Sequence, residues 1–196
     1  MIYLMRHGAD DPDRLGGWSA CGLTDTGKRQ VYQARKRLAN LGITEIYTSD
    51  LPRAKQTAEI VADELRLPVT LLPAFREVNN GVLAGMPKAR AARDFPGVFW
   101  KALDWTQTYP GGESPQQFCE RIKAAWLALK YGVQDQTVLL VTHGGVINLI
   151  LCIENNVPYT NRELRFPVQA AEIISISEQN TANPIASKGR DSFDHP

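Results

Sequence analysis

The stretch IYLMRHG, residues 2–8, decides how the rest of the chain is read. Its apolar half favours a buried β-strand, yet Arg6 and His7 follow at the carboxyl end, before a glycine. A buried strand gains nothing from two basic side chains unless a ligand or partner at that end needs them. A second stretch, TVLLVTHGG at residues 137–145, has the same arrangement: His143 and a glycine follow an apolar run.

Short apolar runs alternate along the chain with segments of helical period, which is the pattern of an α/β domain. We expect helices over 25–40, 52–66, 114–130 and from Gly144 or Gly145 onward, with Thr24 and Ser114 as N-caps. The fold prediction is a three-layer α/β/α sandwich with a largely parallel central sheet. Its expected strands are residues 2–6, 45–48, 69–72, 137–142 and 173–177.

The chain of 196 residues fits one domain, which we place at residues 1–178. The segment 78–112 is rich in glycine, proline and aromatic residues, and we expect it to be a helical insertion over the carboxyl edge of the sheet. The segment 179–196 is polar and broken by glycine and proline, so we expect a disordered tail.

Composition excludes several classes of partner. A formal net charge of +1 offers no clustered basic excess for nucleic acid or an anionic membrane. The longest apolar stretch, 138–153, is interrupted by polar residues and glycines, and no secretory signal is visible. Cys21, Cys119 and Cys152 form neither a metal-type spacing nor an even set, which favours a reducing cytoplasm. The oligomeric state stays open.

The carboxyl ends of parallel strands meet at one edge of an α/β sheet, where ligands bind. We therefore expect His7 and His143 to share a site, although either histidine alone is more often a structural strand end. Arg6 and Arg53 can supply the forked positive charge that binds an anion. Glu77, in FREVNNGVLAG, can protonate the leaving oxygen of a phosphate ester. Taken singly, Arg53 and Glu77 would be read as solvated surface residues.

These residues lie in motifs that occur in a recognisable order: LMRHG, SDLPRAKQTAE, REVNNGVLAG, YPGGES and VTHGG. In that order they resemble the motifs of the histidine phosphatase superfamily, which includes the cofactor-dependent phosphoglycerate mutases. YPGGES is also similar to the segment before the long helix in α-ribazole phosphatases and broad-specificity phosphatases. The resemblance spans residues 2 to about 150.

The resemblance implies a two-step phosphoryl transfer that needs neither metal nor cofactor. His7 would attack phosphorus and form a phosphohistidine, and Glu77 would protonate the leaving alcohol. His7 would have to be neutral, with its other ring nitrogen donating to a backbone carbonyl, whereas His143 would serve better as a cation. The residues expected to bind the phosphoryl oxygens are Arg6, Arg53, His143, Gly144 and Gly17.

The chain departs from the family pattern directly after the signature. Ala9, Asp10 and Asp13 stand where members usually have an acidic or amide residue, a threonine or serine, and a phosphate-binding asparagine. A carboxylate would repel phosphate, so we expect Asp10, Asp11 and Asp13 to form a solvated turn. Backbone N–H groups near Gly17 would then replace the missing amide donor.

The resemblance and these departures predict a phosphatase acting on a small phosphorylated metabolite. Val78, Asn79 and Asn80 stand where mutases carry Arg-His-Tyr, so a phosphoglycerate mutase is the first alternative. A non-catalytic module that binds a phosphorylated ligand is the second. Basic residues of the insertion either meet a second acidic group of the substrate or form a solvated face, namely Lys88, Arg90, Arg93 and Lys101.

Overall fold

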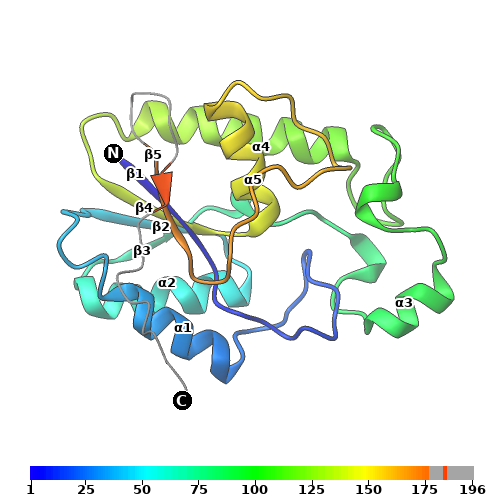
Figure 1. Ribbon diagram of the computed structural model, residues 1–196, viewed down its shortest axis with the longest axis horizontal. Coiled ribbons are helices and arrows are strands. Elements are labelled where there is room, and N and C mark those ends of the chain that lie inside the picture. Colours follow the sequence, from blue (N-terminus) through cyan, green and yellow to red (C-terminus); the bar gives the residue numbers. More distant parts are fainter. Residues whose placement is uncertain (177–182, 185–196) are drawn as a thin grey trace, which may run out of the picture.

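The computed structural model describes residues 1–176 and the backbone of residues 183–184. The expected tail, 179–196, lies outside the described residues except for those two. The strands form one sheet in the order β3-β2-β4-β1-β5-β6 (Figure 1). They are β1 (Ile2–Arg6), β2 (Glu45–Thr48), β3 (Val69–Leu71), β4 (Val138–Thr142), β5 (Ile173–Ile176) and β6 (Asn183–Pro184).

The two histidine-bearing strands are neighbours at the centre of this sheet. β1 and β4 pair in parallel, with Arg6 opposite Thr142, and β5 pairs antiparallel with β1 on its other side. The backbone N–H of His7 donates to the carbonyl of Thr142 at 2.9 Å. Because both strands end at the same level, His7 and His143 leave the sheet side by side.

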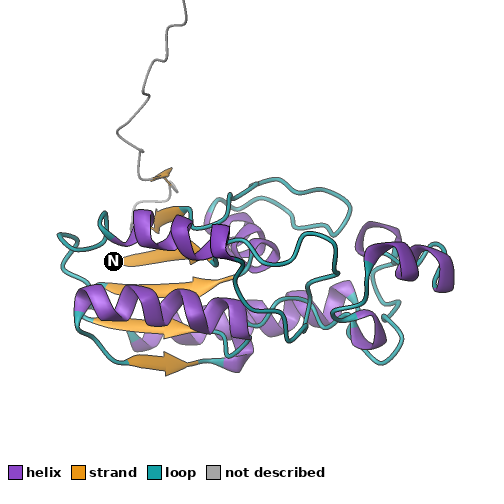
Figure 2. Cartoon of the chain, turned by 90° about the horizontal axis from the view of Figure 1, so that it is seen from below, coloured by secondary structure: helices purple, strands orange, loops and turns teal. Residues whose placement is uncertain are grey.

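Helices cover both faces of the sheet and make the molecule three layers thick (Figure 2). Alternation along β1 sends Leu4 to the face covered by α4 (Pro115–Gly132) and α5 (Gly144–Glu154). Met5 packs on the opposite face against α1 (Asp25–Arg35) and α2 (Pro52–Leu65). Such double burial explains why these strands read as continuous apolar runs.

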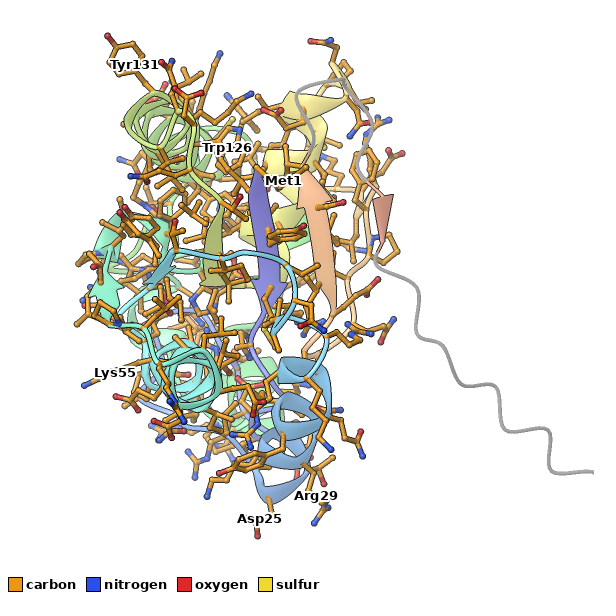
Figure 3. All side chains as sticks on the ribbon, turned by 90° about the vertical axis from the view of Figure 1, so that its left-hand side faces the viewer. Met1, Asp25, Arg29, Lys55, Trp126 and Tyr131 are labelled. Carbon is orange, nitrogen blue, oxygen red and sulfur yellow. The ribbon has the colours of Figure 1, made fainter. Side chains whose placement is uncertain are left out.

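Helix α4 shows how each helix divides between core and solvent. Trp126 is fully buried toward the sheet, whereas Tyr131 is 80% exposed and points away from the body of the protein (Figure 3). The helix begins with the predicted capping box, in which Ser114 accepts from the N–H of Gln117 and Gln117 accepts from that of Ser114. The α/β/α prediction is confirmed.

Segment 78–112 projects beyond the carboxyl edge of the sheet (Figures 1 and 2). It contains α3 (Lys88–Asp94) and 3₁₀ turns at Gly81–Leu83 and Trp100–Ala102, and a further 3₁₀ turn, Pro73–Phe75, precedes it. Leu83, Leu103 and Tyr109 form a small core of its own. Trp100 joins this small core to the main one, because its ring also meets that of Phe118 in α4 at 5.5 Å.

The prediction for the first helix is too long. Helix α1 ends at Arg35, and the chain continues to Gly42 in tighter turns with bonds from Arg37 to Ala34 and from Leu38 to Arg35. The apolar spacing cannot distinguish these turns from a helix, because Leu38 is buried here just as it would be if the helix continued. No helix within residues 1–176 is long and apolar enough to cross a membrane.

Candidate active site

A cleft of about 550 Å³ opens at the carboxyl edge, where β1 and β4 end. This volume lies in the range of pockets for small ligands. Nearly all the predicted site residues line it: Arg6, His7, Gly17, Arg53, Glu77 and Gly144. His143 is fully buried beside the cleft, and its ring centre lies 5.1 Å from that of His7.

His7 is held in one orientation by both ring nitrogens. Its Nδ1 lies 2.7 Å from the carbonyl oxygen of Gly8, so Nδ1–H donates there, as predicted. Its Nε2 accepts from Nε of Arg53 at 3.2 Å, which leaves the lone pair on Nε2. Burial and the nearby Arg53 lower the pKa of His7 to about 3. The ligand-free site therefore contains a neutral imidazole whose unprotonated Nε2 must give up its bond to Arg53 before it can attack a ligand.

The ligand-free structure also indicates the protonation of His143. Burial, followed by the charge of Arg53, holds the pKa of His143 well below its usual value. The ligand-free site therefore favours a neutral His143. The cationic His143 expected during phosphoryl transfer stays a prediction, since it concerns the site with an anion bound. Its Nε2 lies 2.6 Å from Oγ of Ser49, while Nδ1 is buried with no hydrogen-bond partner among the described residues.

Arg53 is 1% exposed and fixed by contacts from two segments of the chain, residues 7–10 and 17–19. Besides its bond to His7, it donates to Oγ of Ser19 at 3.2 Å and to the carbonyl of Gly17 at 2.7 Å. Its Nε also lies 3.4 Å from Oδ2 of Asp10. Asp10 is thus a partner of the arginine inside the cleft, and the expected purely solvated turn is wrong at this residue.

Gly17 contributes through its backbone. It adopts φ +57°, and a Cβ there would lie 1.9 Å from Oδ1 of Asn80, so a side chain is excluded. Asn80 is buried and accepts from the N–H of Trp18 at 3.2 Å. The contact found for Gly17 in the site is its carbonyl, which orients Arg53; phosphate binding by its N–H stays a prediction.

Arg6 is the last residue of β1, and its side chain lies against the N-terminus of α5. It donates to the carbonyl of Val168 at 2.6 Å, while its buried Nε has no partner among the described residues. A Cβ built on Gly144 would lie 3.5 Å from that Nε, which places the guanidinium against the first residue of α5. Buried donors without a partner need an explanation, and a bound anion would provide one here.

Glu77 lies on the same helix terminus. Its Oε2 accepts from the N–H of Gly145 at 3.0 Å, and its Oε1 from the N–H of Val78 at 3.1 Å. A Cβ on Gly145 would come within 2.5 Å of Oε1, so this glycine lets the carboxylate approach α5. Glu77 therefore faces the cleft that also contains His7.

Residues outside the predicted set hold the loop that carries Glu77. Arg121 of α4 donates to the carbonyls of Ala74, Arg76 and Glu77 at 2.7, 3.0 and 3.2 Å. Nε1 of Trp18 also donates to the carbonyl of Glu77, at 2.7 Å. Glu113 pairs with Arg121 at 2.6 Å and accepts from the N–H of Asn79 at 2.7 Å. The YPGGES motif contains Glu113 and was the signal that could have pointed to this network.

No group of three or more histidine, cysteine, aspartate or glutamate side chains within the described part of the chain is arranged to hold a metal ion. The three cysteines there are free thiols.

Sequence comparison identifies relatives over most of the chain. A protein described as probable phosphoglycerate mutase GpmB from Erwinia tasmaniensis is 31% identical over 185 residues, covering 92% of this chain and 86% of that protein. The protein of the same description from Salmonella paratyphi B is 34% identical over 170 residues, covering 84% and 79%.

Some of the solved structures of similar fold are described as phosphatases. A mycobacterial glucosyl-3-phosphoglycerate phosphatase in complex with VO3 is 26% identical, with a TM-score of 0.78 over 93% of this chain and 96% of that one. An α-ribazole phosphatase from Shigella flexneri is 25% identical, with a TM-score of 0.79 over 93% of each chain. Residues 2–188 match the family model described as the histidine phosphatase superfamily (branch 1). With that match and the histidine-bearing edge of its sheet, the chain belongs to the histidine phosphatase superfamily.

Proposed function

We propose that this protein is a metal-independent phosphatase that hydrolyses a small phosphomonoester through a phosphohistidine intermediate on His7. The observation that carries the proposal is the neutral His7, which lines the cleft and whose unprotonated Nε2 accepts a hydrogen bond from the buried Arg53. A phosphoryl group that takes over the guanidinium would free this nitrogen for attack. A nucleophile must present an unprotonated nitrogen, and this histidine does so without a base to remove a proton.

In the first step Nε2 of His7 attacks phosphorus, and the bond from phosphorus to the alcohol oxygen breaks. Glu77 donates a proton to that oxygen, so the alcohol leaves neutral. In the second step water attacks the phosphohistidine, Glu77 accepts a proton from it, and the phosphorus–nitrogen bond breaks. Inorganic phosphate is released, and His7 and Glu77 return to their starting states.

Arg6, Arg53 and His143 stabilise the charge on the phosphoryl oxygens. The unpartnered Nε of Arg6 and Nδ1 of His143 are buried beside His7, where a phosphoryl group would complete their hydrogen bonding. A dianion there also favours the charged form of His143, which restores the cationic role expected for it. Loss of one such donor typically lowers kcat by about a hundredfold or more.

Comparison with relatives supports phosphoryl chemistry in this cleft. A mycobacterial glucosyl-3-phosphoglycerate phosphatase of similar fold has been solved with VO3 and with inorganic phosphate. We propose that the present cleft binds the phosphoryl group of a small metabolite. We also propose that the protein acts in the cytoplasm.

The test is hydrolysis of p-nitrophenyl phosphate in EDTA. We expect turnover by the wild type and a loss of roughly a thousandfold or more in His7→Ala, because the nucleophile is removed. His195→Ala, which changes the third histidine of the sequence, in the segment 179–196 that we expect to be a tail, is the control and should keep full activity. Rapid quenching should trap an acid-labile phosphoryl group on His7. Absence of wild-type turnover would favour the non-catalytic binding module, and an active His7→Ala would exclude the phosphohistidine route.

A mutase is the second candidate, because the sequence relatives are described as probable phosphoglycerate mutases. Residues 78–80 lack the basic and aromatic side chains expected of a mutase, which favours hydrolysis. The two reactions separate in one assay: a mutase interconverts phosphoglycerates when primed with a bisphosphoglycerate, whereas a phosphatase releases inorganic phosphate.

A further inference from the structure

Ser49 lies in the motif SDLPRAKQTAE, and its side chain contacts a histidine of the site. It directly follows β2, which pairs in parallel with β4 so that Thr48 stands opposite Val141. The N–H of Ser49 donates to the carbonyl of Val141 at 3.3 Å, and Oγ1 of Thr48 donates to the carbonyl of Ser49 at 3.1 Å. This register brings Oγ of Ser49 within 2.6 Å of Nε2 of His143.

Both side chains are sealed from water, so their hydrogen bonds must be made within the protein or to a ligand. Ser49 and His143 are each 0% exposed. The Ser49 hydroxyl has one hydrogen-bond partner among the described residues, which is Nε2 of His143, and Nδ1 of His143 has none there. Because an unpaired buried polar group costs more than an ordinary hydrogen bond contributes, the arrangement that leaves the fewest groups unpaired is preferred.

Two arrangements of one proton have to be compared. Burial holds the pKa of His143 low, so the ligand-free ring carries a single proton, on one nitrogen or the other. If Nε2 carries it and donates to Ser49, the hydroxyl hydrogen and the Nδ1 lone pair both lack a partner. If Nδ1 carries it, the hydroxyl donates to Nε2, and only Nδ1–H is left without an acceptor. The second arrangement leaves one group unpaired instead of two.

The same choice decides what a phosphoryl group meets. Nδ1 of His143 is buried beside His7, where the phosphoryl group is proposed to bind. A lone pair on Nδ1 would repel a phosphoryl oxygen, whereas Nδ1–H donates to it. When a bound dianion draws a second proton onto the ring, the Ser49 hydroxyl can rotate and accept from Nε2–H. Nδ1–H then keeps its place in both charge states.

We propose that Ser49 is a positioning residue that holds the proton of His143 on Nδ1, so that the neutral ring already donates a hydrogen bond to the phosphoryl group. The inference rests on the proposed phosphatase function. It adds a residue that acts through His143 without touching the substrate, and oxyanion binding by His143 then does not wait for its protonation.

The position of the proton can be observed by nuclear magnetic resonance of the ring nitrogens. The chain has three histidines, so labelled histidine gives three sets of ring signals, and His7→Gln and His195→Gln identify the two that do not belong to His143. In the ligand-free wild type we expect His143 to be protonated on Nδ1 and unprotonated on Nε2. A proton on Nε2 would overturn the proposal.

Variants of Ser49 test what the hydroxyl does for ligand binding. In Ser49→Ala the proton should move to Nε2 in a large share of the molecules, and the dissociation constant of inorganic phosphate, followed in the same spectra, should rise about tenfold. Ser49→Thr keeps a hydroxyl and should retain Nδ1–H and most of the affinity. Thr48→Val removes the buried hydroxyl one residue earlier, which bonds to a backbone carbonyl, and as the matched control it should behave as wild type.

An unchanged proton position or an unchanged phosphate affinity in Ser49→Ala would overturn the role of Ser49. An equal loss of affinity in Thr48→Val would do the same, because a merely structural effect of a lost hydroxyl would appear in both variants. None of these measurements depends on turnover. If the wild type shows Nδ1–H on His143 but does not hydrolyse p-nitrophenyl phosphate, the result counts against the phosphatase proposal alone.

Discussion

Asp10 is one of the residues at which the cleft departs from the family pattern. A threonine or serine hydroxyl usually stands there, whereas the Asp10 carboxylate lies 3.4 Å from Nε of Arg53. Since Nε of Arg53 also contacts His7, we expect this carboxylate to compete with a phosphoryl group for the same guanidinium. In the proposed reaction Asp10 would weaken oxyanion binding and favour release of the phosphate product.

Removing this charge should tighten binding of inorganic phosphate. In Asp10→Asn we expect the inhibition constant of phosphate against p-nitrophenyl phosphate hydrolysis to fall about tenfold at low salt, and less at high salt because ions screen the repulsion. Asp63→Asn, an exposed carboxylate on α2, is the control and should behave as wild type. An unchanged or higher constant in Asp10→Asn would show that Asp10 does not oppose the anion.

At the scale of elements, α4 controls where the proposed proton donor lies. Its Arg121 holds three carbonyls of the segment 74–77, and Glu113 just before the helix holds both Arg121 and the N–H of Asn79. The other side of Glu77 rests on the N-terminus of α5. The acid is thus clamped between two helices that pack on the same face of the sheet.

Loosening the clamp should impair transfer of the phosphoryl group to His7 most for substrates whose alcohol must be protonated. Arg121→Met removes the hydrogen bonds but keeps an aliphatic stem, and we expect kcat/KM for glycerol 3-phosphate to fall about a hundredfold. p-Nitrophenolate leaves without protonation, so kcat/KM for p-nitrophenyl phosphate, which does not include the later attack of water, should fall far less. Lys123→Met, on an exposed face of α4, is the control. Equal losses on both substrates, with an unchanged melting temperature, would contradict a positioning role for Arg121.

At the scale of the whole molecule, folding places two histidines at the centre of the sheet edge and removes both from water. His7 is 5% exposed and His143 is fully buried, and both pKa values are lowered from 6.5. In the unfolded chain both would titrate near their usual pKa. Below pH 6.5 the unfolded state therefore binds more protons than the folded state, so stability falls as the pH falls.

This linkage predicts acid sensitivity between pH 6.5 and about 3, the folded pKa of His7. Each histidine can contribute up to about 1.4 kcal/mol of lost unfolding free energy per pH unit in that window. Urea denaturation at pH 7.5, 6.0 and 5.0 should show a smaller loss in His7→Gln than in wild type. The same pH dependence in both proteins would contradict the prediction, and His195→Gln provides the control for removing a histidine.

Most helices and strands could be predicted from the sequence, because their signals depend on neighbours along the chain. The apolar runs of β1 and β4 and the capping box at Ser114 were predicted where they are found. The sequence also predicted that one sheet edge would carry Arg6, His7 and His143, because strands paired in parallel end together. The length of α1 did not follow, since burial of Leu38 does not distinguish a helix from successive turns.

The charge states of the site and the contacts that support it could not be predicted without the tertiary structure. The neutral His143, the pairing of Asp10 with Arg53 and the clamp from Arg121 all join residues separated by many positions in the sequence. A pKa depends on burial and on every charge nearby in space, and a motif records neither. For the same reason Lys88 and Lys101 look alike in the sequence, and only the pairing of residues 13–15 with 85–88 brings Lys88 into the cleft.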